Sequence, residues 1–228
     1  MNWRQRSNEK EILDGNAFST EEIWQNMAEL NTINKMLGGH RITIGGFKKL
    51  LGDRRSVSVY EIGCGGGDNL AVIYHWARKR GIAVHCTGID LNADCIEFAR
   101  SRFPEGNYIL GDYRQEITGA KPDIIFSSLF CHHFEDTELA GQLKWMQDNC
   151  HLGFFINDLH RNRVAYYAIK VLTAVFSDSR LVKNDAPVSV KRGFSFEDWR
   201  DLFKSSGIHR YTVNWKWAFR WLVIVKKA

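Results

Sequence analysis

Several features that define whole classes of protein are absent from these 228 residues. No internal repeat, low-complexity segment or linker divides the chain, and no window reaches the roughly 18 uninterrupted apolar residues of a spanning helix. The first ten residues lack the apolar stretch of an export signal. The five cysteines are odd in number and never occur as Cys-x-x-Cys. We therefore expect reduced thiols in a cytoplasmic protein without a membrane span.

Charge of either sign is not in large excess. Lys and Arg number 31 against 26 Asp and Glu, and the net charge of +5 is spread along the chain. No basic stripe of the kind that follows a nucleic-acid backbone is visible, so no nucleic-acid partner is predicted. Hydrophobic residues make up 44% and aromatic residues 13%, which supplies a sizeable core and excludes disordered, collagen-like and coiled-coil classes. One domain over residues 1–228 is the expectation.

From residue 57 onward, short apolar runs alternate with helical patterns. Strands are predicted at residues 57–62, 82–89, 108–110, 124–130 and 153–156. Helices are predicted between them at residues 69–80, 93–103 and 137–149. This alternation predicts a parallel sheet with helices on both faces. The last two apolar runs, residues 209–215 and 218–225, predict strands six and seven.

Two further segments are expected to cover this core. Residues 1–50 have helical patterns and include a predicted capping box at Ser19 and Glu22. A helical insertion or lid at residues 160–193 begins with a helix to residue 176 and continues as an irregular stretch that contains Pro187. Because that first helix is apolar nearly all round, we expect it to be buried, or to meet an apolar ligand or a bilayer surface. A second capping box is predicted at Ser195 and Asp198.

The strongest chemical signal is the glycine-rich loop Gly63-Cys64-Gly65-Gly66-Gly67, which joins the first strand to a helix. Glycines allow a tight turn and a close approach of a ligand to the backbone. In a dinucleotide-binding loop the third glycine stands five residues after the first, but Asp68 occupies that position here. Carboxylates at Asp68 and Glu61 would repel a pyrophosphate and attract a cation. S-adenosylmethionine, which carries a sulfonium and an ammonium group, fits this pattern better than NAD.

The loop resembles motif I of the class I S-adenosylmethionine-dependent methyltransferases, acidic-x-Gly-x-Gly-x-Gly, which Glu61, Gly63, Gly65 and Gly67 match. The resemblance implies a Rossmann-like seven-stranded α/β sheet and S-adenosylmethionine as cofactor. It also implies cofactor contacts after the next strands. The implied contacts are Asp90 on the ribose hydroxyls, Asp112 on the adenine amino group, and Cys64, Leu91, Tyr113 and Ser128 in the same site. Each acid has an open alternative, since Asp90 could cap a helix and Asp112 could be a turn residue.

The acceptor side is implied by the segment after the fourth strand. His132-His133-Phe134-Glu135-Asp136 resembles the His-x-aromatic-x-Asp stretch of phenol O-methyltransferases, in which the histidine is the general base. By that alignment His132 is the base, and His133 is the other candidate. Adjacent residues on a helix cannot both face one cleft, so a histidine pair that caps the next helix stays an alternative.

A second polar group follows the fifth strand. Asp158 and His160 lie two apart, so an extended strand would place them on one face at the edge of the sheet. His160 is then an alternative base, while Arg161 and Tyr166 are assigned to the acceptor. In the other interpretation Asp158 caps the following helix. No His-Glu-x-x-His, cysteine-rich or acidic-triplet arrangement is present, so no metal site is predicted.

These assignments predict methyl transfer from S-adenosylmethionine to a small hydrophobic acceptor, phenolic or polyketide-derived, with oxygen favoured over carbon. Looser stretches of the chain resemble bacterial methyltransferases that modify quinones and polyketides. The alternatives are methylation of RNA or protein, a nicotinamide-dependent oxidoreductase, and a non-catalytic protein that binds S-adenosylmethionine. RNA methylation is disfavoured because no Asn-Pro-Pro-Tyr-like segment follows the fourth strand. The sequence leaves open whether the protein is a monomer or a homodimer.

Overall fold

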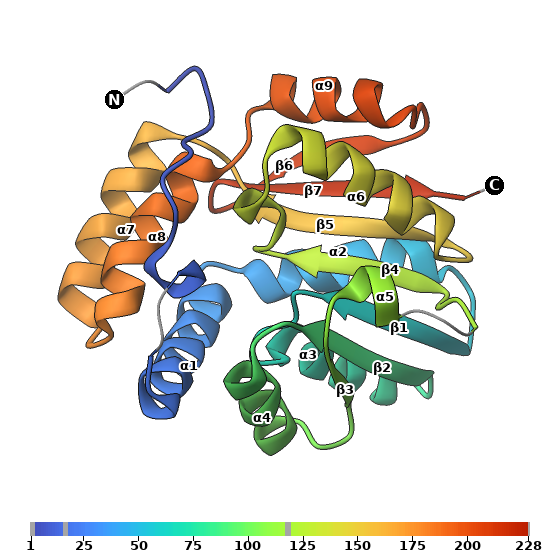
Figure 1. Cartoon of the computed structure of the whole chain (residues 1–228). Helices are drawn as coiled ribbons and strands as arrows, with labels where there is room; N and C mark the ends of the chain where they lie inside the picture. Colours follow the sequence, from blue (N-terminus) through green and yellow to red (C-terminus); the bar gives the residue numbers. More distant parts are fainter. Residues whose placement is uncertain (1–2, 16–17, 117–119, 228) are drawn as a thin grey trace.

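The computed structural model describes residues 3–15, 18–116 and 120–227; the rest of the chain, including parts of the segment 1–50 expected as a cover, lies outside the described residues. Seven strands form one sheet in the order β3-β2-β1-β4-β5-β7-β6 (Figure 1). The strands are β1 (Ser56–Ile62), β2 (Ala83–Asp90), β3 (Asn107–Leu110), β4 (Ile124–Ser128), β5 (Gly153–Leu159), β6 (Thr212–Lys216) and β7 (Arg220–Lys226). The first five are parallel, and β7 runs antiparallel to both of its neighbours. The predicted seven-stranded α/β fold is confirmed.

The sheet is buried on both faces, which explains the continuous apolarity of its central strands. Every residue of β4 is buried. On β5 the neighbours Phe154 and Phe155 point to opposite faces, because side chains alternate along a strand. Phe155 stacks on Phe126 with ring centroids 4.7 Å apart, while Phe154 belongs to the cluster around Trp199. Two hydrophobic layers therefore hold the sheet in place.

Helices supply the outer layers. They are α1 (Thr20–Met36), α2 (Gly39–Leu51), α3 (Asp68–Arg78), α4 (Ala93–Arg102), α5 (Tyr113–Glu116), α6 (Asp136–Asp148), α7 (Arg163–Phe176), α8 (Arg180–Arg192) and α9 (Phe196–Ser206), with short 3-10 turns η1 (Ile12–Asp14) and η2 (Cys131–His133). Buried residues of α2, α3 and α4 pack on one face of the sheet, and those of α6 and α9 pack on the other. Helices α1, α7 and α8 lie beyond the carboxyl ends of the parallel strands (Figure 1).

Both predicted capping boxes are confirmed. The Ser19 hydroxyl accepts the Glu22 N–H at 3.3 Å, and the Glu22 carboxylate accepts the Ser19 N–H at 3.2 Å. Ser195 and Asp198 make the same reciprocal pair at the start of α9. These local signals fix where helices begin, because they satisfy backbone donors that have no partner inside the helix.

Several predicted elements differ in the structure; β5 continues to Leu159 instead of ending at residue 156, and β6 begins at Thr212 instead of at residue 209. The fourth strand ends at Ser128 and not at residue 130, because Leu129 has a positive φ of 54° that turns the chain out of the sheet. The stretch around Pro187, expected to be irregular, is helix α8. Its buried side chains Leu181, Val182, Val188 and Val190 outweigh the poor helix propensity of an internal proline.

Of the three alternatives predicted for the apolar helix α7, burial in the core is wrong. Only Ala165 and Thr173 of this helix are buried, whereas Val164, Tyr167, Val171 and Val175 are exposed. The reason is its position, since α7 packs on α8 at the periphery and not on the sheet (Figure 1). Among the described residues, no helix is both long enough and apolar enough to cross a membrane.

The N-terminal segment, residues 3–14, runs over α8 and completes the cover. We call it the strap. The Asp185 carboxylate on α8 accepts the N–H groups of Ile12 and Leu13 at 2.8 and 3.1 Å. The Arg192 guanidinium donates to the carbonyl of Glu9 at 2.8 Å. The strap is therefore fastened to α8 at several points above the sheet edge.

Candidate active site

A cavity of about 900 Å³ opens at the carboxyl edge of the sheet. Its polar lining comes from the loop after β1, the ends of β2 and β4, and the strap. Its apolar lining comes from the covering helices. These side chains are Met27, Leu30, Ile33, Leu37, Ile169, Leu172, Val182 and Val190. The cavity therefore combines a few polar groups with a largely apolar wall, as small-molecule sites do.

The glycine loop forms one wall of the cavity. Gly63, Gly65 and Gly67 all have positive φ values, of 65°, 49° and 71°, which glycine adopts without strain. Gly63 and Gly65 line the cavity, but Gly67 does not. A Cβ atom at Gly67 would lie 2.5 Å from the Tyr108 hydroxyl, so this glycine is required for backbone conformation and packing.

Asp90 holds the loop from the end of β2. One carboxylate oxygen accepts the N–H of Gly65 at 2.8 Å, and the other accepts the N–H of Asn92 at 3.0 Å. The N-cap of α4 is Asn92, so Asp90 is not the helix cap of the alternative interpretation. Burial raises the pKa of Asp90 above its usual value, against the lowering effect of these hydrogen bonds. Leu91 lies beside it, exposed at the cavity wall.

Glu61 is a buried carboxylate with an unused oxygen. Its Oε1 atom accepts from the Asn69 amide at 3.0 Å, but its Oε2 atom has no hydrogen-bond partner among the described residues. Burial, together with the charges of Asp68 and Asp90, raises the pKa of Glu61 well above its usual value. A cation in the cavity would satisfy this oxygen and favour the charged carboxylate.

Arg220, at the start of β7, is a site residue that sequence reasoning missed. Its guanidinium is buried and lines the cavity, and its Nε and Nη1 atoms have no partner among the described residues. Burial lowers the pKa of Arg220 to about 10, against the charges of Asp158 and Asp68. The signal available in the sequence was a single arginine inside an apolar terminal run. Asp68 itself is paired with His40 at 2.6 Å.

The remaining predicted cofactor residues also line the cavity. Asp112 is paired with Arg114 at 2.5 Å, which lowers the pKa of its carboxyl. The Tyr113 ring packs edge-on against Trp145 with centroids 4.7 Å apart. Cys64 and Ser128 are buried at the wall. Of the ten predicted cofactor residues, only Gly67 is therefore outside the lining.

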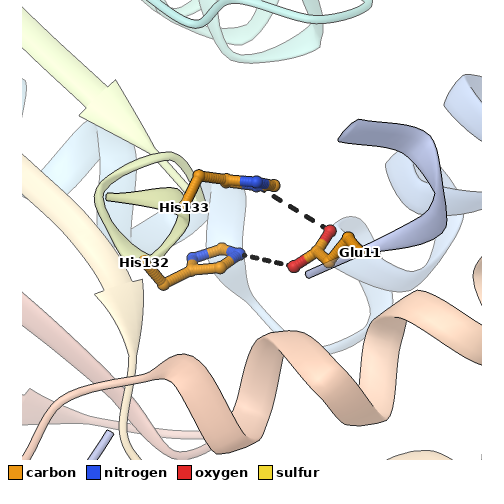
Figure 2. Close-up of side chains that lie close together, drawn as sticks. All are labelled: Glu11, His132 and His133. Carbon is orange, nitrogen blue, oxygen red and sulfur yellow. Dashed lines mark ion pairs between the residues drawn. The ribbon is translucent and has the colours of Figure 1, made fainter. Parts of the chain in front are cut away.

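Beside this region, His132 lies buried between two carboxylates. Its Nδ1 atom is 2.7 Å from Asp158 Oδ1, and its Nε2 atom is 3.3 Å from Glu11 Oε1 (Figure 2). Asp158 is fully buried on β5, behind the histidine. Glu11 comes from the strap and was not predicted as a site residue. The Ser189 hydroxyl on α8 donates to the same Glu11 oxygen at 2.5 Å.

His133 faces the same carboxylate from the other side. Its Nε2 atom lies 3.8 Å from Glu11 Oε2 (Figure 2). Its Nδ1 atom lies 3.1 Å from Asp14 Oδ1. The expectation that two adjacent histidines cannot share a cleft is wrong here, because they lie in a three-residue 3-10 turn and Glu11 reaches both rings. They do not cap the next helix either, since the N-cap of α6 is Glu135.

The two carboxylates change the chemistry of His132. Burial alone would lower its pKa, but the charges and hydrogen bonds of Asp158 and Glu11 outweigh burial and raise the pKa to about 9. The pKa of each carboxyl is lowered despite burial, because each faces an imidazolium. The ordinary pKa of a histidine side chain is about 6.5. The structure instead gives a histidine that is protonated at neutral pH while Glu11 is in place.

Glu11, His132 and His133 could also hold a divalent ion. Their ligand atoms all lie within 4.8 Å of one another, and two imidazoles with one carboxylate suit zinc and related metals. The two imidazoles already bind aspartates through their Nδ1 atoms, as metal-bound histidines do. That the protein binds no metal stays a prediction. Treatment with a chelator, which removes bound metal, can test it.

Three predicted acceptor-side residues lie elsewhere. The Nδ1 atom of His160 accepts the Trp215 indole N–H at 3.2 Å, and His160 does not line the cavity. Arg161 donates to the Gly193 carbonyl at 2.8 Å and to Asp198 at 2.7 Å. Tyr166 packs on Trp3. The structure brings Asp158 to His132 but does not bring His160, Arg161 or Tyr166 to the cavity.

Part of the chain matches a known protein family. Residues 59–151 match the family described as "Methyltransferase domain". No curated protein sequence matches the chain. Plantazolicin methyltransferase BpumL, solved with SAH, is 16% identical and has a TM-score of 0.68. The alignment covers 91% of this chain and 95% of the BpumL chain.

Two further solved structures are similar. Human N-acetylserotonin methyltransferase in complex with SAM is 15% identical with a TM-score of 0.64, covering 92% of this chain; the match spans only 56% of the human chain. Magnesium protoporphyrin IX methyltransferase from Synechocystis PCC 6803, with bound SAH, is 14% identical with a TM-score of 0.55, covering 86% of this chain and 87% of its own. At these identities the likeness concerns the fold. The family match covers residues 59–151, which include the glycine loop, and it supports the methyltransferase predicted from that loop.

Proposed function

We propose that the protein transfers the methyl group of S-adenosylmethionine to an oxygen atom of a small hydrophobic acceptor, phenolic or polyketide-derived. The observation that carries the proposal is the meeting of Asp90, Glu61 and the glycine loop in one cavity, where a carboxylate oxygen of Glu61 has no partner among the described residues. That oxygen is complementary to a cationic ligand and repels a pyrophosphate. The similar structures solved with SAM or SAH support the same donor.

The charges around the cavity match both ends of the donor. In the proposal Asp90 binds the ribose hydroxyls, Asp112 binds the adenine amino group, and Glu61 accepts from the ammonium group. The buried Arg220 guanidinium is left to bind the carboxylate of the methionine moiety, because its Nε and Nη1 atoms are unpaired among the described residues. A zwitterionic group would then be held between Glu61 and Arg220, which leaves neither buried charge alone.

The acceptor side is assigned to His132. In its neutral form the Nε2 atom takes the proton of the acceptor hydroxyl while the oxygen attacks the methyl carbon; the carbon–sulfur bond breaks, and S-adenosylhomocysteine leaves. Asp158 holds Nδ1 and so orients the ring. Glu11 lies where the acceptor hydroxyl must approach, so we assign it, with His133, to positioning of the acceptor. Transfer to carbon by the same base is the alternative chemistry.

The apolar wall selects the kind of acceptor. Side chains of α1, α7 and α8 line the cavity, so a hydrophobic molecule gains burial there, whereas a nucleotide or a charged peptide would lose hydration. This favours a small hydrophobic acceptor over RNA or protein. A quinone- or polyketide-like acceptor belongs to this class.

Calorimetric titration with S-adenosylmethionine, S-adenosylhomocysteine and NAD tests the donor. We expect both sulfur ligands to bind and NAD not to bind. Asp90→Ala should weaken S-adenosylhomocysteine binding by about tenfold or more, since it removes a charged hydrogen-bond acceptor. The matched control is Asp94→Ala, because Asp94 bonds the Thr20 hydroxyl on the surface. Binding of NAD, or equal binding by the Asp90 variant, would contradict the proposal.

A screen of phenols and polyketides then tests the acceptor. The parent enzyme should methylate a member of this panel, and His132→Gln should bind donor normally but transfer at least about a hundredfold more slowly. The matching substitution at the other histidine, His160→Gln, serves as control, because His160 lies outside the cavity. If donor binding is intact and the panel and broader RNA and protein substrates all fail, the non-catalytic alternative is supported instead.

A further inference from the structure

We infer that the outer face of α7 docks on an anionic lipid surface. This face consists of Val164, Tyr167, Val171 and Val175, which recur at three- and four-residue intervals and so form one stripe along the helix. Their exposed fractions lie between 62% and 66%, and Phe176 at the end of the helix is 80% exposed. No described residue covers the stripe.

The opposite face of the same helix, unlike the stripe, has a place inside the molecule. Ala165, Ile169 and Leu172 line the cavity. The apolar residues on the cavity side of the helix face the space proposed for the acceptor. The apolar residues on its outer side have no partner among the described residues. Large exposed apolar patches on monomers mark surfaces that bind another protein or a membrane.

Charge distinguishes these two partners. Helix α7 carries Arg163 and Lys170 and no acidic residue. These two residues are seven apart, so they lie on the same flank of the apolar stripe. An apolar face with aromatic residues and a basic flank is the pattern of a helix that lies in the interface of an anionic membrane.

A second copy of the chain fits this face less well. Helix α7 is basic at Arg163 and Lys170 and has no acidic residue, whereas Arg180 and Lys191 on α8 are already paired with Glu22 and Glu9. A two-fold dimer built on α7 would bring two such helices together, and like charges would oppose association. Anionic headgroups, by contrast, complement the helix.

The location also bears on how the acceptor arrives, a point that rests on the proposed function. Because one helix contributes both the cavity wall and the docking face, lipid-bound α7 would place the cavity next to the bilayer. An acceptor with a long apolar part, dissolved in lipid, could then enter without crossing water. Docking itself requires neither donor nor acceptor.

Vesicle flotation of the full chain tests the docking. We expect the protein to float with phosphatidylcholine vesicles that contain phosphatidylglycerol, and to float much less with phosphatidylcholine alone or at high salt. Val171→Asp combined with Val175→Asp should reduce flotation more than tenfold. Arg163→Gln combined with Lys170→Gln should reduce binding about fivefold per charge, and only on anionic vesicles.

The control is Phe196→Asp, which adds one aspartate, half the charge of the double variant, at another exposed apolar residue, 49% exposed on α9. It should float like the parent protein. Calorimetry with S-adenosylhomocysteine should give unchanged binding for the α7 double variant, so loss of flotation cannot be mistaken for unfolding or for failure of the proposed function. No flotation of the parent, equal flotation of the α7 variant, or a stable dimer that this variant dissociates would each overturn the inference.

Discussion

At the residue scale, the acceptor end of the cavity is governed by one histidine between two carboxylates. His132 is bound by Asp158 from behind and by Glu11 from the strap. Each carboxylate favours the imidazolium over the neutral ring. The position of Glu11 therefore controls whether His132 can accept a proton at neutral pH.

This control can be measured without knowing the acceptor. We expect an NMR titration of the His132 ring to give a pKa of about 9, and Glu11→Gln to lower that pKa, because the substitution removes a charge that favours the imidazolium. Activity that depends on neutral His132 should rise with pH toward about 9 and should shift to lower pH in the variant. The control Glu9→Gln alters a strap carboxylate that pairs with Lys191. A ring that titrates at the same pH in Glu11→Gln and the parent would rule out this role for Glu11.

A second residue-scale prediction concerns Arg220. Arg220→Met should weaken binding of S-adenosylhomocysteine by about tenfold or more, because a charged pair with the ligand carboxylate is lost. Decarboxylated S-adenosylmethionine should bind the parent and the variant alike, since it has no carboxylate to lose. Arg210→Met, at an exposed position, is the matched control. Equal weakening for both ligands would mean that Arg220 acts only on the shape of the cavity.

At the scale of elements, the loop between β1 and α3 depends on glycine for its conformation. Gly67→Ala should destabilise the protein by at least about 1–2 kcal/mol, because alanine is strained at a φ of 71° and its Cβ would meet the Tyr108 hydroxyl. Gly141→Ala is the control, since Gly141 lies inside α6 with open space around it. It should stabilise by about 0.5–1 kcal/mol. Thermal unfolding of both variants measures the opposite signs; a neutral Gly67 variant would contradict the assignment.

The covering elements are held differently from the sheet. Arg192 on α8 donates to the carbonyls of His132 and His133 and also to Glu9 of the strap. A single guanidinium thus joins strap, α8 and the histidine turn. The end of the cavity at His132 is assembled from three segments that are far apart in the sequence. Arg6 of the strap joins them as well, because it donates to the carbonyls of Arg192 and Phe134.

At the scale of the whole molecule, the buried histidine links stability to pH. The pKa of His132 is raised to about 9 in the folded protein from about 6.5 in the unfolded chain. The resulting stabilisation, on the order of 3 kcal/mol, is fully present below about pH 6.5 and is lost as pH rises toward 9. Glu11 and Asp158, whose pKa values are lowered, contribute stability that is lost in acid.

Urea unfolding between about pH 6 and about pH 10 tests this linkage. The parent protein should lose stability across the range, and His132→Gln should be less stable at the lower end but show a much flatter dependence. A parallel loss in the two proteins would assign the pH dependence to other groups.

The sequence by itself determined the sheet, the glycine loop and the meeting of Glu61, Asp90 and Asp112 at one edge. These depend on signals that are local in the chain: apolar runs set strands, capping boxes set helix starts, and the three acids stand at or just after the ends of β1, β2 and β3. The tertiary structure decided the rest. Glu11 and Arg220 enter the cavity from the two ends of the chain, and α7 packs at the periphery where its apolar outer face stays exposed. Such contacts depend on which distant segments pack together, and local pattern does not encode them.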